Sequence, residues 1–339
     1  MTKRELVLKA FRNEKPERIP VGFWFHYAKD ELVDGFENPE VFETNIAGHR
    51  KFYTDFQPDL VKIMTDGYFI YPNKLFMEAK TLDDLRKVQS IGENHEWIER
   101  QVAFAKTIKG IYGDEVLSFY NIFSPATLFK FGKHGEENAS KLFADFAVED
   151  SAALAHALGV LAEDFAILAR RVINEAKING IYYSVQDVAD SRFSDALRLE
   201  VNAPADRVVL DAANEAGATS ETGALNILHI CGYEGQRNNL SHYVDYPAQI
   251  INWAAAVEKV SLAQGKRLFG GRPVIGGFDS TVNGVLYKGD RAEIEAETRR
   301  LLQEAGTTGV VLGADCTIPR DIKLDHLRWV RDAAVAFQD

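Results

Sequence analysis

The chain alternates eight short, apolar, β-rich runs with longer segments of helical pattern. The runs show little polar alternation, which is typical of strands that are covered on both faces. The clearest helix is predicted over 150–177, and the last one over 324–337. This alternation favours an α/β fold, a (β/α)8 barrel, over a doubly wound sheet. The predicted strands span residues 19–25, 60–64, 116–123, 180–185, 225–230, 250–253, 273–278 and 309–313.

Composition limits the class of function. The 339 residues carry 39 Lys and Arg against 50 Asp and Glu, a net charge of −11. Such a chain lacks the basic patch that nucleic acids need, and anionic membranes would repel it. No uninterrupted apolar run approaches the roughly 20 residues that cross a bilayer. Two cysteines cannot form a disulfide framework, so a reducing, cytoplasmic setting is expected. No linker divides the sequence, and we expect one domain over 1–339.

Functional residues are expected where the predicted strands end, because the chemistry of such barrels gathers at the carboxyl ends of the strands. The charged segment 73–109 is long for a strand-to-helix connection. We expect helical excursions over the barrel mouth there, with plain surface elaboration as the alternative. The residues at the strand ends are His26, Asp66, Asn121, Ser124, Gln186, His229, Cys231, Asn252, Asp279 and Cys316.

The sharpest of these features is the H-x-C sequence from His229 to Cys231, together with Cys316. Residues i and i+2 of an extended segment share a face, so His229 and Cys231 point the same way. Cys316 follows the eighth predicted strand, across the barrel mouth from the fifth. One imidazole and two thiolates would make a zinc site with an open fourth position, as in catalytic zinc sites. The alternative is that both cysteines are small buried hydrophobes.

Four further segments form a recognisable pattern: Pro16-Glu-Arg-Ile-Pro-Val21, Ile63-Met-Thr-Asp-Gly67, Tyr246-Pro247 with Asn252-Trp253, and the Gly-Gly-Phe-Asp run that ends at Asp279. With them the chain resembles the uroporphyrinogen decarboxylase superfamily over about residues 1–335, which implies a single TIM barrel. That superfamily contains porphyrinogen decarboxylases and zinc-dependent methyltransferases, which pass a methyl group from a methylcobamide to a thiol such as coenzyme M. The set His229, Cys231 and Cys316 matches the zinc motif of the methyltransferase branch.

The decarboxylase branch is a poorer match. Its Arg-Gln-Ala-Gly-Arg segment holds the carboxylates of a tetrapyrrole, but this chain has Phe25-His-Tyr-Ala-Lys29, in which only Lys29 keeps a cation. A multiply anionic porphyrinogen needs several fixed positive charges. The decarboxylase also has a histidine in a Leu-Gly-His-Gly segment, where this chain has Leu312-Gly-Ala-Asp-Cys316. Asp66, in Thr-Asp-Gly, does match the catalytic aspartate of the decarboxylase.

The resemblance therefore implies a zinc-dependent methyltransferase that holds one Zn²⁺ per chain. Zinc deprotonates a thiol in the open position, and the resulting thiolate attacks the methyl group. The chain has no Asp-x-His-x-x-Gly corrinoid-binding segment, so the donor would be a free methylcobamide or a separate corrinoid protein. One alternative is a carboxy-lyase in which Asp66 stabilises a protonated intermediate. Another is a non-catalytic barrel that binds a corrinoid or a methylated metabolite.

Supporting roles are predicted for other residues near the strand ends. Asp279 is expected to orient His229 through its second ring nitrogen, or else to cap the following helix. Asp66 is expected to contact substrate, or else to pair with Lys62 or Lys29. Asp315 is expected to be a loop carboxylate rather than a spare ligand. Pocket or cofactor contacts are predicted for His26, Tyr27, Asn121, Gln186 and His242, with hydrogen bonds to buried backbone groups as the alternative for Asn121 and Gln186.

Aromatic residues are dense at the same end of the predicted barrel. Aromatic walls suit an apolar or quaternary-ammonium substrate through cation–π contacts. Ordinary barrel core is the alternative, and we favour it for Phe23. The residues concerned are Phe23, Trp24, Phe25, Tyr27, Tyr68, Phe69 and Tyr71.

Overall fold

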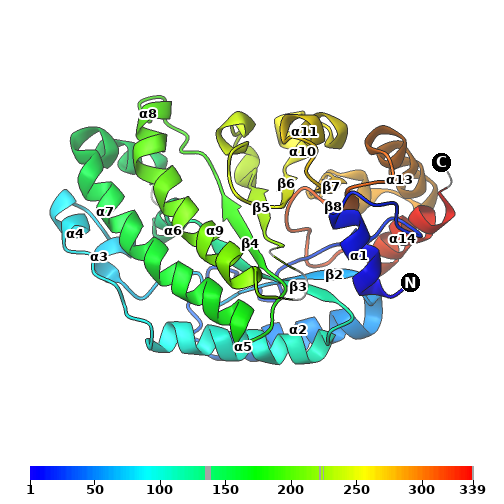
Figure 1. Ribbon diagram of the computed structural model, residues 1–339, viewed down its shortest axis with the longest axis horizontal. Coiled ribbons are helices and arrows are strands. Elements are labelled where there is room, and N and C mark those ends of the chain that lie inside the picture. Colours follow the sequence, from blue (N-terminus) through cyan, green and yellow to red (C-terminus); the bar gives the residue numbers. More distant parts are fainter. Residues whose placement is uncertain (134–138, 221–222, 224, 338–339) are drawn as a thin grey trace.

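Eight parallel strands form one sheet that curves into a nearly closed barrel with helices between the strands (Figure 1). The computed structural model describes residues 1–133, 139–220, 223 and 225–337. The (β/α)8 prediction is confirmed, and each strand lies within its predicted run or one residue beyond it. The strands are β1 Val21–Gly22, β2 Leu60–Ile63, β3 Leu117–Phe123, β4 Ile181–Val185, β5 Ile227–Ile230, β6 Ile250–Trp253, β7 Val274–Phe278 and β8 Val310–Ala314.

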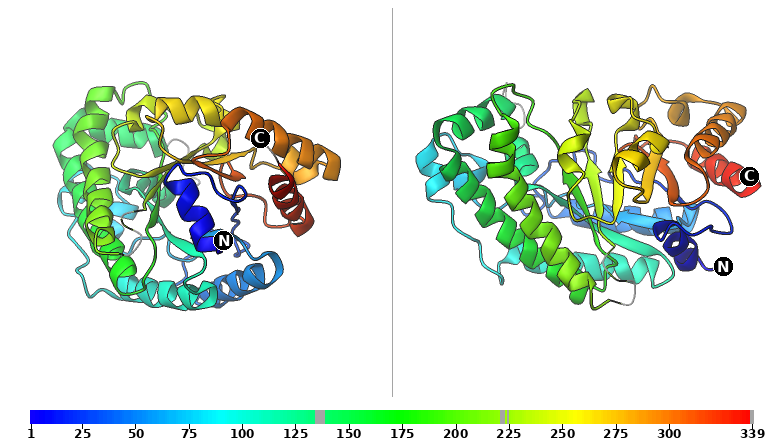
Figure 2. Two further views of the ribbon diagram at one scale, coloured as in Figure 1. Left: turned by 45° about the vertical axis from the view of Figure 1, so that its right-hand side comes forward. Right: turned by 45° about the horizontal axis from the view of Figure 1, so that its top comes forward.

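Helices connect the strands and surround the sheet (Figures 1 and 2). The first half of the chain contributes α1 Lys3–Phe11, α2 Glu40–Phe56, α3 Lys74–Met77, α4 Leu82–Arg86, α5 Glu96–Tyr112, α6 Pro125–Gly132 and α7 Ala139–Asn174. The second half contributes α8 Asp195–Leu197, α9 Ala203–Gly217, α10 Ala255–Glu258, α11 Leu262–Leu268, α12 Val285–Lys288, α13 Arg291–Ala305 and α14 Leu324–Ala336. The second half also contains one short π-helical turn, η1 Arg198–Asn202, and two 3₁₀-helical turns, η2 Tyr233–Gly235 and η3 Leu240–Tyr243.

The long helix α7 begins earlier than predicted. Its backbone departs from helical geometry at Asp150 (φ −155°, ψ 87°), and the Asp150 carboxylate accepts a hydrogen bond from the Ala153 N–H. The predicted start at residue 150 is therefore a real local boundary, although a further helical segment precedes it. α7 has the length and apolar composition of a membrane-crossing helix. Its apolar side chains are nevertheless packed in the core of this barrel, as those of Leu161 and Phe165 show.

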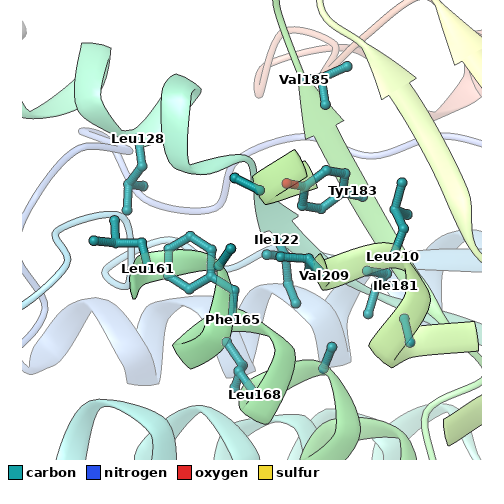
Figure 3. Close-up of a cluster of buried hydrophobic side chains, with 14 of the residues drawn as sticks. Ile122, Leu128, Leu161, Phe165, Leu168, Ile181, Tyr183, Val185, Val209 and Leu210 are labelled. Atoms are coloured by element: carbon teal, nitrogen blue, oxygen red, sulfur yellow. The ribbon is translucent and has the colours of Figure 1, made fainter. Parts of the chain in front are cut away.

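The core has two layers, one outside the sheet and one inside the barrel. Outside, β3 and β4 pack against α6, α7 and α9 through side chains such as Ile122, Tyr183 and Phe165 (Figure 3). Inside, Leu60, Ile227 and Ile250 cluster with apolar side chains of α1, which covers the amino end of the barrel (Figure 2). Because strand side chains alternate between faces, residues two positions after these interior residues also point inward. Lys62, His229 and Asn252 are those residues.

The barrel closes between β1 and β2, the two edges of the sheet. Buried carboxylates join these edges. Asp59, just before β2, accepts the backbone N–H of Val21 at 2.9 Å and two hydrogen bonds from the Arg18 guanidinium at 2.7 Å. Asp66, after β2, accepts the backbone N–H groups of Tyr27 and Ala28 at 2.8 and 3.0 Å. Side-chain hydrogen bonds thus hold both ends of this seam.

Candidate metal centre

A cavity of about 890 Å³ lies at the carboxyl ends of the strands. Every strand, or the segment that follows it, contributes to its walls. The segment 73–109 forms the predicted helices α3, α4 and α5, but none of the residues that line the cavity comes from it. This agrees with the alternative of surface elaboration rather than with the expected cover over the mouth. One lining residue for each strand in order is His26, Lys62, Phe123, Ser184, His229, Ala254, Asp279 and Cys316.

The three predicted metal ligands come together at this cavity. Their ligand atoms all lie within 4.8 Å of one another. The Cys231 and Cys316 sulfurs are 3.9 Å apart, and the Cys316 sulfur is 3.4 Å from His229 Nε2. Tetrahedral zinc with ordinary Zn–S and Zn–N bonds would separate two sulfurs by about 3.8 Å, and a sulfur from a nitrogen by about 3.6 Å. The spacing and chemistry of this donor set therefore fit zinc.

The two thiols lie within hydrogen-bonding distance of each other. Their mutual hydrogen bond lowers the pKa of Cys316, which lies beside His229 and Lys62, and raises the pKa of Cys231. Of the two thiols, Cys316 is therefore the one that ionises first. A second thiolate requires a cation between the sulfurs, which is the role that a bound metal ion fills.

Asn252 holds the imidazole of His229. The two residues are neighbours in the register of β5 and β6, and Asn252 Oδ1 contacts His229 Nδ1. The Asn252 amide nitrogen donates to the carbonyl oxygens of Ile275 and Ala314 at 2.8 and 3.3 Å, which fixes the orientation of the amide. Oδ1 can only accept, so Nδ1 carries the hydrogen and Nε2 keeps its lone pair toward the two sulfurs.

This arrangement corrects the prediction that Asp279 orients His229. Asp279 lines the cavity, but its carboxylate accepts the Thr281 N–H at 2.8 Å in a local turn, ahead of α12. Gly276, in β7 before Asp279, matters for the position of Asn252. Gly276 has φ +138°, and a Cβ there would lie 3.2 Å from the Asn252 amide nitrogen. Glycine at this position therefore leaves the room that the amide occupies.

Lys62 is a site residue that the sequence analysis did not select. Its side chain is 4% exposed and lines the cavity. The ammonium nitrogen lies 4.3 Å from the ring centroid of Tyr182 and 5.8 Å from that of Trp24. Burial lowers the pKa of Lys62 to about 8, although the charges of Cys316, Cys231 and Asp66 act against this shift.

Asp66 has a structural position rather than the predicted place against substrate. It is fully buried and is not among the residues that line the cavity. Besides its two backbone partners, it accepts a hydrogen bond from His26 Nδ1 at 2.7 Å. Burial alone would raise its pKa, but these hydrogen bonds outweigh that effect, so the pKa is lowered. The predicted pairing with Lys62 or Lys29 is replaced by the contact with His26, which does line the cavity.

The four predicted pocket or cofactor contacts other than His26 have different outcomes. Gln186 lines the cavity, with its amide near Lys130 and the Tyr233 carbonyl. Tyr27 packs on His49 outside the cavity. Asn121 bonds to the side chains of Thr65 and Ser184 in the barrel interior, rather than to buried backbone groups as the alternative had it. His242 lies between Asp187 and Asp195, outside the cavity, so its predicted pocket contact is wrong.

Asp315 is more enclosed than a loop carboxylate. It is 2% exposed and lines the cavity beside Cys316. One oxygen accepts the Ala256 N–H at 2.7 Å, and the other has no hydrogen-bond partner among the described residues. Burial raises its pKa to about 7. It is not part of the metal-binding cluster.

Of the aromatic residues predicted near the mouth, only Phe69 lines the cavity. Phe123 and Phe131 join it, with ring centroids 4.9 Å and 6.1 Å from that of Phe69. The three rings form an apolar wall. Phe23, Trp24 and Tyr71 are instead buried in the core, which agrees with the alternative.

A comparison with known protein families shows which family the chain belongs to. The sequence profile described as Uroporphyrinogen decarboxylase (URO-D) matches residues 61–337. The chain belongs to the uroporphyrinogen decarboxylase family. Among proteins of curated function, none matches the sequence.

Solved structures share the fold of this uroporphyrinogen decarboxylase family member. A methyltransferase from Methanosarcina mazei is similar with a TM-score of 0.70 and 18% identity, over 99% of both chains. A putative vitamin-B12-independent methionine synthase from Listeria monocytogenes has a TM-score of 0.51 and 15% identity, over 94% of this chain and 97% of that one. At these identities the similarity establishes the fold.

Proposed function

We propose that this chain is a zinc-dependent methyltransferase that passes a methyl group from a methylcobamide, or a similar donor, to a thiol. The observation that carries the proposal is the cluster of His229 Nε2 and the two cysteine sulfurs at the cavity, with the spacing of tetrahedral zinc ligands. The names of two structures with this fold, a methyltransferase and a methionine synthase, support the same class of reaction.

The chain's own residues would bind and orient the reactants. His229, Cys231 and Cys316 would hold zinc and leave its fourth position toward the cavity. When bound, zinc would lower the pKa of a thiol that coordinates it, so that the thiol reacts as its anion. Asn252 keeps the Nε2 lone pair of His229 directed toward the two sulfurs, where the metal would lie. The wall of Phe69, Phe123 and Phe131 would give the methyl group an apolar surface on one side of the cavity.

The donor would enter from the open end of the cavity. Since the sequence lacks a corrinoid-binding segment, we propose that the methylcobamide arrives free or on a separate corrinoid protein. The reducing cytoplasm is the setting that we propose, because two neighbouring thiols must stay reduced to bind metal. The carboxy-lyase alternative gains no support from Asp66, whose oxygens are occupied by His26, Tyr27 and Ala28.

Elemental analysis of the purified protein is the first test. We expect about one zinc per chain in the wild type and loss of that zinc in Cys316→Ser, since two protein ligands rarely hold a catalytic zinc. Asp279→Asn is the matched control, because Asp279 lines the same cavity without touching the ligands. Demethylation of methylcobalamin in the presence of thiols, followed by absorbance, should disappear in Cys316→Ser. Full activity in a zinc-free, folded protein would refute the proposal.

A further inference from the structure

Lys62 differs from the other buried lysines of the described chain. Lys109 donates to the Gly113 carbonyl at 2.7 Å and pairs with Asp114, and Lys133 donates to the Met77 carbonyl at 2.9 Å. For Lys62 the contacts are aromatic faces, and no oxygen of the described residues accepts a hydrogen bond or an ion pair from its ammonium. Burying an ammonium without such a partner is unfavourable. The position therefore points to a partner that enters the cavity.

The nearby protein anions do not fill this role. Asp66 raises the pKa of Lys62, but its oxygens already accept hydrogen bonds from His26 and from two backbone N–H groups. The other anions that act on Lys62 are the sulfurs of Cys316 and Cys231. Two thiolates neutralise a divalent zinc ion, so in the loaded site those sulfurs carry no surplus negative charge. The Lys62 ammonium is then left without an anion of the described chain that bonds to it.

We propose that Lys62 is the counter-charge for the sulfur anion that occupies the open position beside His229, Cys231 and Cys316. This inference rests on the proposed function and deepens it. The ligand class is a thiol that binds as its anion and releases its proton to solvent. The added negative charge supplies the buried Lys62 ammonium with the anionic partner that no oxygen of the described residues provides. A neutral ligand in the same position gains nothing from Lys62.

The test compares anionic and neutral ligands on the cobalt(II)-loaded protein, in which absorption bands report what binds the metal. Cobalt stoichiometry is measured first in each variant. Dissociation constants are then measured for 2-mercaptoethanol, 3-mercaptopropionate and imidazole. We expect Lys62→Met to weaken both thiols by about tenfold to a hundredfold, the usual effect of removing a bond to a charged group, and to leave imidazole unchanged. Lys62→Arg keeps the charge and should restore thiol binding, and Lys109→Met is the control for loss of a buried lysine outside the cavity.

Each other result counts against the inference. Equal weakening of thiols and imidazole would mean that Lys62 supports the geometry of the site, and no weakening would mean that its charge is irrelevant. Weakening of 3-mercaptopropionate alone would place Lys62 against the carboxylate tail of the ligand. A wild type that takes up neither cobalt nor zinc would overturn the proposed function and this inference with it. Normal metal uptake with unchanged thiol binding in Lys62→Met overturns only the inference.

Discussion

The group that orients the metal-binding histidine is an amide, and this can be tested at a single residue. Asn252→Ala removes the acceptor of His229 Nδ1, so the imidazole is free to rotate or to place its hydrogen on Nε2. Loss of such an orienting group typically costs 10- to 100-fold in metal affinity, and we expect the dissociation constant for zinc to rise by about that factor. Competition with a chromophoric chelator measures it.

Asn121→Ala is the matched control. Asn121 is also a buried asparagine that points into the barrel, but its partners are Thr65 and Ser184 rather than a metal ligand. We expect its zinc affinity to match that of the wild type. If both alanine variants bound zinc equally well, the orienting role of Asn252 would be wrong.

The metal ligands were predictable because their signal is local. The H-x-C spacing on an extended segment already places His229 and Cys231 on one face, and only the position of Cys316 depends on the fold. Asn252 and Lys62 carry no such signal for their roles. Which strand neighbours His229, and whether Lys62 in its apolar run points inward, follow from the register and closure of the barrel. Asp279 was the plausible but wrong choice for the same reason.

Between β1 and β2, where the barrel closes, hydrogen bonds accepted by Asp66 take the place of strand pairing. Asp66→Asn keeps the shape but removes the negative charge and one acceptor from His26, Tyr27 or Ala28. We expect a loss of about 2–4 kcal/mol in the free energy of unfolding at pH 7, as for other broken buried charge contacts. Chemical denaturation measures it. Hydrogen exchange should show faster exchange at the Tyr27 and Ala28 amides.

The pH dependence follows from the lowered pKa of Asp66. A carboxylate with a lower pKa in the folded state stabilises the protein above its unfolded pKa of about 4, and this stabilisation disappears as pH falls through the folded value. The stability gap between wild type and Asp66→Asn should therefore shrink in acid. Asp30→Asn, an exposed change in the loop after β1 that also contains Tyr27 and Ala28, is the control. Intact zinc binding in Asp66→Asn would agree with a structural role, and an undiminished gap at low pH would contradict it.

Most of the strands and helices could be predicted from the sequence, and the departures from prediction have physical causes. Buried strands of a parallel sheet are continuous apolar runs, so all eight could be located from the sequence. β1 is shorter than its run because only Val21 and Gly22 pair with β8. The segment 73–109 is helical as predicted, but Trp97 packs against Tyr71 and Phe165. Periodicity predicts that a segment forms a helix, whereas packing partners decide whether it covers the cavity or the outer face of the barrel.

The molecule as a whole holds a positive charge in the interior of a chain whose net charge is −11. The free energy of folding is a small difference between large terms. The cost of burying one ammonium without an anionic partner is therefore a large share of the net stability. Its pKa of about 8 in the folded protein lies below the ordinary value of 10.5. Lys62 therefore binds its proton more tightly in the unfolded chain than in the folded protein. At any pH at which Lys62 is charged in the folded protein, its burial lowers the stability of the fold.

Lys62→Met should therefore stabilise the protein while it weakens thiol binding. The penalty in the wild type is fully present below pH 8 and is relieved as pH rises from about 8 toward 10.5, because the unfolded state binds more protons over that range. We expect Lys62→Met to gain roughly 1–3 kcal/mol at pH 7, with the shift in pKa setting the upper limit. Chemical denaturation of chelator-treated protein across this pH range measures it, with the exposed Lys51→Met as the control. If Lys62→Met were instead less stable at pH 7, Lys62 would contribute to folding. That result would contradict the prediction, because an ammonium whose role is ligand binding should destabilise the protein when the site is empty.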